Sequence, residues 1–472
     1  MKQLSFLALL LTFSTCQTPE EQTEKPAQGP PNFVIIYCDD LGYGDLGVYG
    51  NPVIQTPHLD QMAQEGQKWT QFYVADPVCT PSRAALMTGR YPIRSGMTSK
   101  ERAVLFPDSG GGLPSDEITI AEMLKQKEYA TGHVGKWHLG HLPQFLPASQ
   151  GFDYYFGIPY SNDMDVLDDW RNYKQRAEDP NYRADTKGYN VPLIENTEIV
   201  ERPADQNTIT RRYTEKAVEF IQQHQQRPFF LYLAHSMPHI PLFAGEEFVG
   251  TSKRNLYGDV IEEIDWSVGQ VLKTIRELNL EQNTIVMFSS DNGPWLAFKT
   301  HGGSAGPLRA GKGTTFEGGQ RVPTIFWGPG QISPGVVNQL GSTLDVITTF
   351  ASIAGVSAPT DRKLDGYNLS PVLQGKGPSP RKEFYYWAFG ELHAVRSGPW
   401  KLHIQQRQPV NYGNIAPMER PELYHLEADI SEKYDQAATE TAVVARLEQL
   451  LQDHLVDVEG STPDQLKLRI NQ

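Results

Sequence analysis

Two continuous apolar segments, each closed by an acidic pair, constrain the fold of this chain most. Residues 33–38 read Phe-Val-Ile-Ile-Tyr-Cys and run into Asp39-Asp40, and residues 284–288 read Thr-Ile-Val-Met-Phe and are soon followed by Asp291-Asn292. Such runs are typical of strands covered on both faces, as in parallel sheets. Because ligands bind beyond the carboxyl ends of these strands, we expect both pairs to face one crevice.

The rest of the chain alternates strand-like and helix-like segments. Strands are predicted near residues 131–134, 229–234 and 322–327, and helices near residues 57–63, 119–127, 208–223 and 259–278. This alternation predicts an α/β fold with a large, mostly parallel (mixed) sheet flanked by helices. Past residue 375 the pattern changes: segments 384–387, 392–404 and 441–455 predict a smaller C-terminal α+β domain built on an antiparallel sheet.

The first residues have the composition of an export signal. Lys2 precedes the apolar residues 4–13, and small residues then lead to Cys16, so residues 1–15 are too short to span a bilayer and are predicted to be a signal peptide. The segment resembles a bacterial lipoprotein signal, in which Cys16 would carry the lipid and residues 16–31 would form a flexible tether. A plain secretory signal is the alternative. We expect an exported protein, in the periplasm or on the outer membrane of a bacterium, anchored only through lipid.

Charge and cysteine content exclude several classes of protein. The 472 residues include 42 Lys and Arg against 56 Asp and Glu, a formal net charge of −14. Nucleic-acid binding is therefore not expected, because it needs a basic surface. The 3 cysteines are too few for a disulfide framework.

The acidic pairs themselves suggest a metal site. Three carboxylates and one amide oxygen repel one another at close range unless a cation lies among them, and hard oxygen ligands favour Ca²⁺ or Mg²⁺. The alternative is that these residues form turns or cap helices, a frequent use of acidic residues after strands.

The most specific segment is Cys79-Thr80-Pro81-Ser82-Arg83, which is followed by Thr88-Gly89-Arg90. Thr80-Pro81 predicts a helix start with proline at its first position, which would place Cys79 just outside a helix N-terminus. On these residues alone, Cys79 is an activated thiolate or a small buried side chain. The full pattern resembles the signature of type I sulfatases, a family in which this cysteine is oxidised to Cα-formylglycine by a maturation enzyme.

The resemblance runs from Asn32 to about Leu426 and is carried by several separate blocks. They are residues 39–45 (DDLGYGD), 135–141 (GKWHLGH), 157–161 (GIPYS), 238–241 (PHIP) and 311–321 (GKGTTFEGGQR). It implies an alkaline-phosphatase-like catalytic domain over residues 32–375, with residues 376–472 as the C-terminal subdomain. It also implies that the protein hydrolyses sulfate esters and depends on the maturation enzyme.

The resemblance assigns roles residue by residue. The metal, expected to be Ca²⁺ with Mg²⁺ as the alternative, would be held by Asp39, Asp40, the modified Cys79, Asp291 and Asn292. Catalytic roles would fall to the formylglycine as nucleophile, Asp291 as its base, His239 as acid for the leaving oxygen and His138 as base in sulfate release. Preorganised positive charge would come from Lys136, Lys312 and the helix N-terminus, and Arg83 would hold the aldehyde hydrate in register. Ser161 and His301 would bind substrate; Lys299, Asp163, Asp165 and Arg171 are further candidates for contacts with the sugar, and His235 for a supporting role.

The substrate is less constrained than the reaction. Similarity of residues 140–145 to the galactosamine-6-sulfatase branch of the family favours a sulfated carbohydrate, attacked from the non-reducing end at galactose or N-acetylgalactosamine carrying sulfate at position 4 or 6. Two alternatives stay open: a formylglycine-dependent phosphonate monoester hydrolase or phosphodiesterase, and an inactive glycan-binding protein of the same fold.

Overall fold

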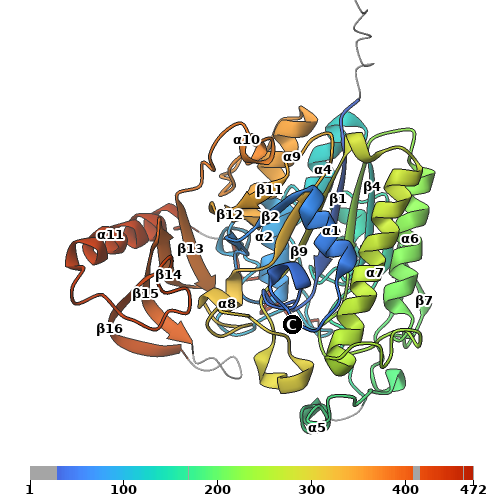
Figure 1. Cartoon of the computed structure of the whole chain (residues 1–472), viewed down its shortest axis with the longest axis horizontal. Coiled ribbons are helices and arrows are strands. Elements are labelled where there is room, and N and C mark those ends of the chain that lie inside the picture. Colours follow the sequence, from blue (N-terminus) through green and yellow to red (C-terminus); the bar gives the residue numbers. More distant parts are fainter. Residues whose placement is uncertain (1–28, 168–169, 408–414, 461, 471–472) are drawn as a thin grey trace, which may run out of the picture.

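A mixed sheet of 10 strands forms the centre of this computed structural model, in the order β11-β2-β10-β9-β1-β8-β4-β5-β6-β7 (Figure 1). The structure describes residues 29–167, 170–407, 415–460 and 462–470. The five central strands are mutually parallel: β9 (Thr284–Ser290), β1 (Asn32–Cys38), β8 (Phe229–Ala234), β4 (Ala130–Gly135) and β5 (Tyr154–Gly157). The outer strands are β11 (Gly335–Val337), β2 (Gln67–Trp69), β10 (Thr324–Trp327), β6 (Leu193–Glu195) and β7 (Glu198–Glu201). The predicted α/β sheet is confirmed.

The alternation of side chains along β1 divides the core into two layers. Val34 and Ile36 pack on one face and Phe33 and Ile35 on the other, and all four are fully buried. The first face is covered by α1 (Pro57–Glu65), α6 (Ile209–Gln223) and α7 (Asn255–Glu277). The second face is covered by α2 (Cys79–Thr88), α4 (Ile120–Leu124), α9 (Val346–Ala354) and α10 (Ser370–Leu373). Burial on both faces explains why the central strands are apolar throughout.

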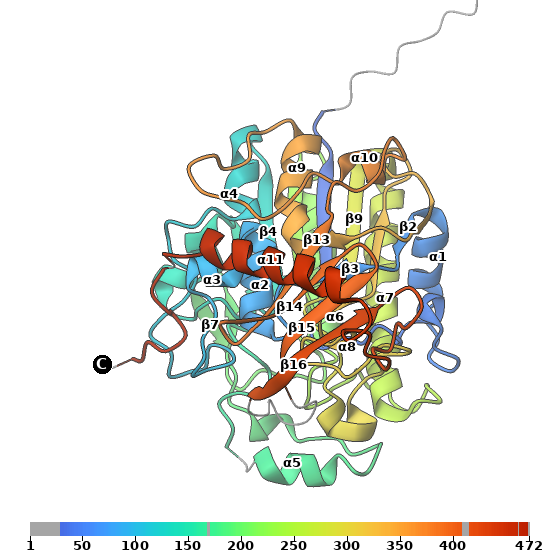
Figure 2. The same ribbon diagram turned by 90° about the vertical axis from the view of Figure 1, so that its left-hand side faces the viewer.

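The C-terminal region contains the predicted antiparallel sheet. Its strands are β13 (Glu383–Ala388), β14 (Glu391–Ser397), β15 (Trp400–Arg407) and β16 (Ile415–His425), paired in that order. Figure 2 shows α11 (Thr441–Asp457) lying across this sheet. The remaining strands and α-helices of the described chain are the short strands β3 (Phe72–Tyr73) and β12 (Gly341–Ser342) and the helices α3 (Pro92–Ser95), α5 (Trp170–Arg176) and α8 (Glu317–Gln320).

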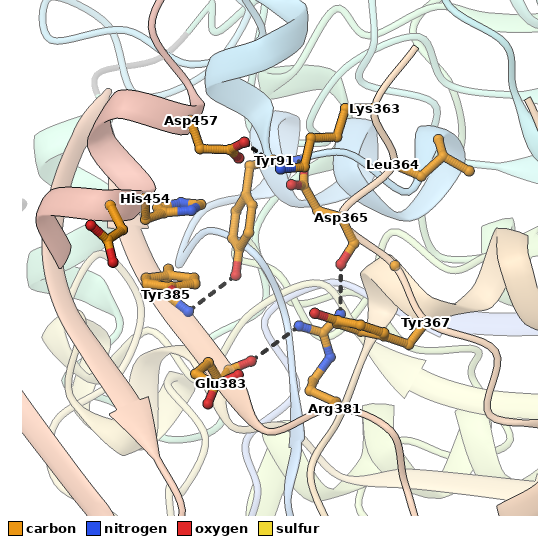
Figure 3. Close-up of a pocket in the computed structure, with 12 residues that line it drawn as sticks. Tyr91, Lys363, Leu364, Asp365, Tyr367, Arg381, Glu383, Tyr385, His454 and Asp457 are labelled. Atoms are coloured by element: carbon orange, nitrogen blue, oxygen red, sulfur yellow. Dashed lines mark hydrogen bonds and ion pairs between the residues drawn. The ribbon is translucent and has the colours of Figure 1, made fainter. Parts of the chain in front are cut away.

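A pocket of about 330 Å³ marks the junction between α11, β13 and the large domain (Figure 3). The ring of His454 on α11 stacks on Tyr385 of β13 with centroids 3.8 Å apart, and the His454 Nε2 accepts a hydrogen bond from Trp387. Arg381 pairs with Asp345 at 2.9 Å and spans the same junction. The polar groups around the pocket are thus paired with neighbouring side chains, and the pocket lies between packed parts of the molecule.

The predicted signal peptide and most of the predicted tether, residues 1–28, lie outside the described residues. Within the part of the chain that the structure does describe, no helix has the length and apolar character needed to cross a membrane.

Candidate active site

The two acidic pairs come together because β1 and β9 are parallel neighbours with Cys38 opposite Ser290. The backbone amide of Asp40 donates to Asp291 Oδ1 at 3.1 Å, and the Asn292 amide nitrogen donates to Asp40 Oδ1 at 2.7 Å. Asp40 has a φ of 65°, in the left-handed region that a residue other than glycine seldom adopts. Strain of this kind persists where the surroundings fix a functional geometry.

Cys79 is the first residue of α2 and is 1 % exposed. The helix thus begins two residues earlier than predicted, and Pro81 is its third residue rather than its first. Proline is accepted there because the amides of a first helical turn have no partner within the helix. The Cys79 Sγ lies 3.3 Å from Asp39 Oδ1 and 3.5 Å from Lys312 Nζ.

Each carboxylate of the cluster is paired with its own buried cation. Lys136 Nζ lies 2.5 Å from Asp39 Oδ2, and Lys312 Nζ lies 2.6 Å from Asp40 Oδ1. The guanidinium of Arg83, one helical turn after Cys79, contacts Asp291 Oδ2 at 2.8 Å. Three negative and three positive side chains therefore surround residue 79, away from solvent.

Burial and these charges shift the pKa values within the cluster in opposite directions. Burial opposes ionisation of Asp39, but Lys136, His239 and Arg83 together hold its pKa well below the usual range. Burial and repulsion by Asp39 raise the pKa of Asp291 to about 7. Burial, reinforced by Asp39, also raises the pKa of the Cys79 thiol well above its usual value.

The donor atoms fit a divalent cation. One possible ligand atom from each of Asp39, Asp40, Cys79 and His239 falls in a group whose members lie within 4.8 Å of one another. The Asn292 Oδ1 is buried and accepts no hydrogen bond from any residue that the structure describes. Leaving a buried acceptor unpaired is costly, and a metal ion would satisfy it.

The two histidines differ in which ring nitrogen is available. His138 Nε2 lies 2.8 Å from the carbonyl of Leu105, so it carries the proton and Nδ1 is left as an acceptor. Among described residues, nothing hydrogen-bonds to that buried Nδ1. In His239 the arrangement is reversed: Nδ1 lies 2.6 Å from the carbonyl of Ile240, and Nε2 points towards Ser161 Oγ at 3.4 Å. Burial is the largest cause that lowers the pKa of both rings.

The remaining predicted residues divide into those at the cluster and those beyond it. Ser161 accepts a hydrogen bond from Lys136 at 2.8 Å and so belongs to the cluster. His301 is buried with its ring nitrogens 2.8 Å from the Tyr173 hydroxyl and 3.0 Å from the carbonyl of Asp179. His235 contacts Ser267 at 3.3 Å, and Lys299 pairs with Glu178 at 2.7 Å on the surface.

The acidic candidates for sugar contacts have different surroundings. Asp165 pairs with Arg202 at 2.9 Å, whereas Asp163 Oδ1 is buried and has no hydrogen-bond partner in the described parts of the chain. The side chain of Arg171 is outside the described residues.

Two residues at the site were missed in the sequence. The Asn162 Oδ1 lies 3.1 Å from His239 Nδ1. The ring of Trp295 is tilted against that of His239 with centroids 5.4 Å apart, and Lys312 Nζ lies 4.4 Å from the Trp295 centroid. Their positions, directly after Ser161 and three residues after Asn292, were the available signal.

Comparison with known families matches almost the whole described chain. The model described as "Sulfatase" matches residues 31–356, and the one described as "C-terminal region of aryl-sulfatase" matches residues 379–471. The chain belongs to the sulfatase family. Arylsulfatase A of Bos taurus is 42% identical over 429 residues, covering 87% of this chain and 84% of that relative. N-acetylgalactosamine-6-sulfatase of Canis lupus familiaris is 39% identical over 468 residues, covering 91% and 86%.

Solved sulfatase structures have the same architecture. The PsFucS1 sulfatase from Pseudoalteromonas sp. has a TM-score of 0.80 at 27% identity, covering 92% of each chain. The crystal structure of Ps i-CgsB in complex with k-i-k-neocarrahexaose has a TM-score of 0.77 at 31% identity, covering 93% of this sulfatase and 95% of that chain. The protein is thus a sulfuric ester hydrolase, as its sequence motifs predicted.

Proposed function

We propose that this sulfatase removes sulfate from galactose or N-acetylgalactosamine units of sulfated polysaccharides, at position 4 or 6 and from the non-reducing end. The observation that carries the reaction class is the buried cluster in which residue 79 lies between Asp39 and Lys312. The choice of sugar is supported by the relative named N-acetylgalactosamine-6-sulfatase and by the neighbour crystallised with a carrahexaose.

The nucleophile is proposed to be a hydroxyl of the hydrated formylglycine formed from Cys79. In the encoded protein, the Cys79 Sγ stands where the oxygens of that hydrate would lie. A bound Ca²⁺, or alternatively Mg²⁺, would act as a Lewis acid and orient the sulfate group, held by Asp39, Asp40, residue 79, Asp291 and Asn292.

The side chains around residue 79 would share the handling of charge and protons. The ammonium groups of Lys136 and Lys312 would lie beside the sulfate oxygens and stabilise their charge, while Arg83 fixes the orientation of the Asp291 carboxylate. Asp291 would accept the proton of the attacking hydroxyl. The unpaired Nδ1 of His138 would accept the proton of the second hydroxyl, which expels sulfate.

His239 would protonate the leaving alcohol through Nε2. Burial lowers the pKa of this ring in the free protein, so the proton must be gained when the anionic sulfate ester enters. Ser161 and Asn162 contact the two ring nitrogens and would hold the imidazole in place. His301 and Asp163 would contribute to the sugar pocket. The charges of Lys136 and Lys312 act on the Asp163 carboxyl.

The test is an activity profile of enzyme whose formylglycine content is verified by mass spectrometry of the peptide containing residue 79. We expect release of sulfate from 4- or 6-sulfated galactose or N-acetylgalactosamine, and loss of activity after chelation that added Ca²⁺ restores. Activity only on sulfated glucosamine or uronic acids would contradict the proposed sugar. Preference for an aryl phosphate diester over an aryl sulfate would instead favour the phosphodiesterase alternative.

A Cys79→Ala variant separates catalysis from binding. We expect it to lose turnover completely, because the nucleophile is gone, while it still binds sulfated glycans. Turnover by this variant would contradict the mechanism, and glycan binding without any turnover in the wild type would favour the inactive binding protein.

We further propose that the protein is exported and anchored by lipid at Cys16, with a partner maturase that oxidises Cys79. Globomycin sensitivity of processing, together with mass spectrometry of the N-terminus, tests the anchor. A mature chain that begins elsewhere and carries no lipid would replace it with a plain secretory signal.

A further inference from the structure

The segment that carries Lys312, residues 309–320 and here named the Lys312 loop, is hydrogen-bonded to the residues that precede α2 and to those that follow β9. The Gly313 amide donates to the carbonyl of Pro77 at 2.9 Å, two residues before Cys79. The Gly293 amide, next to Asn292, donates to the carbonyl of Gly319 at 3.0 Å. A Cβ at Gly293 would lie 1.7 Å from the Gly318 oxygen, so only glycine allows this approach. Movement of the loop therefore moves groups around residue 79.

The other side of the same loop is held by the C-terminal region, by Lys401 in its sheet and by Glu432 in the segment after β16. Lys401 of β15 donates from Nζ to the carbonyl of Thr315 at 2.8 Å and contacts Glu317 Oε1 at 3.0 Å. Glu432 accepts the backbone hydrogen bond of Glu317, the first residue of α8, at 2.7 Å. In both Figure 1 and Figure 2, α8 lies beside this sheet.

The contact is a closed network of buried charges. Lys401 also pairs with Glu432 Oε1 at 2.9 Å, and the Tyr386 hydroxyl donates to Glu317 Oε1 at 2.8 Å. Lys401, Glu317 and Glu432 are all fully buried. A satisfied network of this kind permits one arrangement of its members, because any other leaves a buried charge unpaired.

From this geometry we infer that Lys401 and Glu432 are positioning residues for catalysis: the C-terminal sheet sets the place of Lys312 through Thr315 and Glu317. The four-stranded sheet then belongs to the active site without touching substrate. Lys312 reaches Asp40 from a loop whose backbone has anchors in both regions of the chain. This inference rests on the proposed role of Lys312 in sulfate ester hydrolysis.

The test compares Lys401→Met with Arg381→Met in full-length, formylglycine-bearing enzyme. Both variants remove a buried cation from the junction of the C-terminal region, but Arg381 pairs with Asp345 and not with the Lys312 loop. Misplacement of a catalytic group by about 1 Å can cost on the order of 10²-fold, so we expect kcat of Lys401→Met to fall by about 10–100-fold with little change in KM. We expect Arg381→Met to lose thermal stability but keep kcat.

A double-mutant cycle separates positioning from general damage. In a Lys312→Ala background, Lys401→Met should lower kcat little further, because the group that Lys401 positions is absent. In enzyme that keeps Lys312, Lys401→Arg should retain part of the kcat that Lys401→Met loses. Additive effects, or an equal fall in kcat for Arg381→Met, would overturn the inference. An inactive wild type would instead contradict the proposed function, so the two failures are distinguishable.

Discussion

At the scale of residues, the proton carried by each active-site histidine follows from which ring nitrogen faces a backbone carbonyl. His239 donates from Nδ1 to Ile240, so its Nε2 is the nitrogen that can serve the leaving oxygen. His138 donates from Nε2 to Leu105, so its Nδ1 is the available base. The two imidazoles are thus suited to different roles, acid and base, because the backbone presents a carbonyl to a different ring nitrogen in each.

This assignment predicts that His239→Ala depends on the leaving group. General acid catalysis contributes typically 10²–10⁴-fold, and a poor leaving group needs it most, so kcat/KM for a sugar sulfate should fall by about 10²–10³-fold. An aryl sulfate with an acidic phenol should lose less than about tenfold on the same reasoning. The measurement is a plot of kcat/KM against the pKa of the leaving alcohol, and an equal loss across the series would contradict the role.

For His138→Ala the same reasoning predicts a different kinetic signature. Since the base proposed here would act after the alcohol has left, one equivalent of alcohol should be released rapidly and later turnovers should be slow. Stopped-flow measurement with an aryl sulfate checks this. A uniform fall without a burst would place His138 in the first step or in binding.

At the scale of elements, α2 depends on how closely it meets α9. Gly89, at the end of α2, has a φ of 68°, and a Cβ there would lie 2.2 Å from Cγ2 of Ile347. Gly355, at the end of α9, has a φ of 65° but an added Cβ would meet nothing within 4 Å. The two glycines share a backbone conformation and differ in surrounding space.

This difference predicts unequal effects of alanine at the two sites. Gly355→Ala should cost about 1–2 kcal/mol of the free energy of unfolding, the usual penalty of the left-handed conformation. Gly89→Ala should cost more and lower activity, because the clash displaces the helix that carries Cys79 and Arg83. Urea unfolding with activity assays checks both, and equal losses would mean that the contact with Ile347 adapts freely.

Helices and strands that follow from a local sequence pattern were predictable, but the pairing of these elements in space was not. The prediction of residues 229–234 as a strand is confirmed by β8, and the predicted helix near 259–278 is confirmed by α7, which starts earlier at Asn255. The antiparallel pairing of β10 with β9 depends on chain direction, which apolar content does not encode. The Lys401 contacts escaped prediction because Glu317 lies 84 residues away in sequence and no local pattern links them.

At the scale of the whole molecule, the buried His454 at the junction of α11 and β13 predicts that the folded protein loses stability in acid. Burial, with Arg94 nearby, lowers the pKa of His454 to about 3 in the folded protein, and its Nε2 accepts a hydrogen bond from Trp387. In the unfolded chain the imidazole has a pKa near about 6.5, so the unfolded state binds more protons below that pH. Stability is then lost as pH falls from about 6.5 towards 3.

The expected change is about 2 kcal/mol in the free energy of unfolding between pH 7 and pH 5 from this residue alone. Urea titrations at both pH values measure it, and His454→Gln, which keeps an acceptor and cannot be protonated, should flatten the dependence. An unchanged pH dependence in that variant would assign the acid sensitivity to other groups.

The direction of β1 has a consequence for how the enzyme meets a polymer. The chain enters the domain at Asn32, and the catalytic carboxylates lie at the opposite end of that strand, 7 residues further on. An anchor at Cys16, as proposed above, would therefore join the domain at the end of β1 remote from these carboxylates, so the attachment would not stand between them and a substrate.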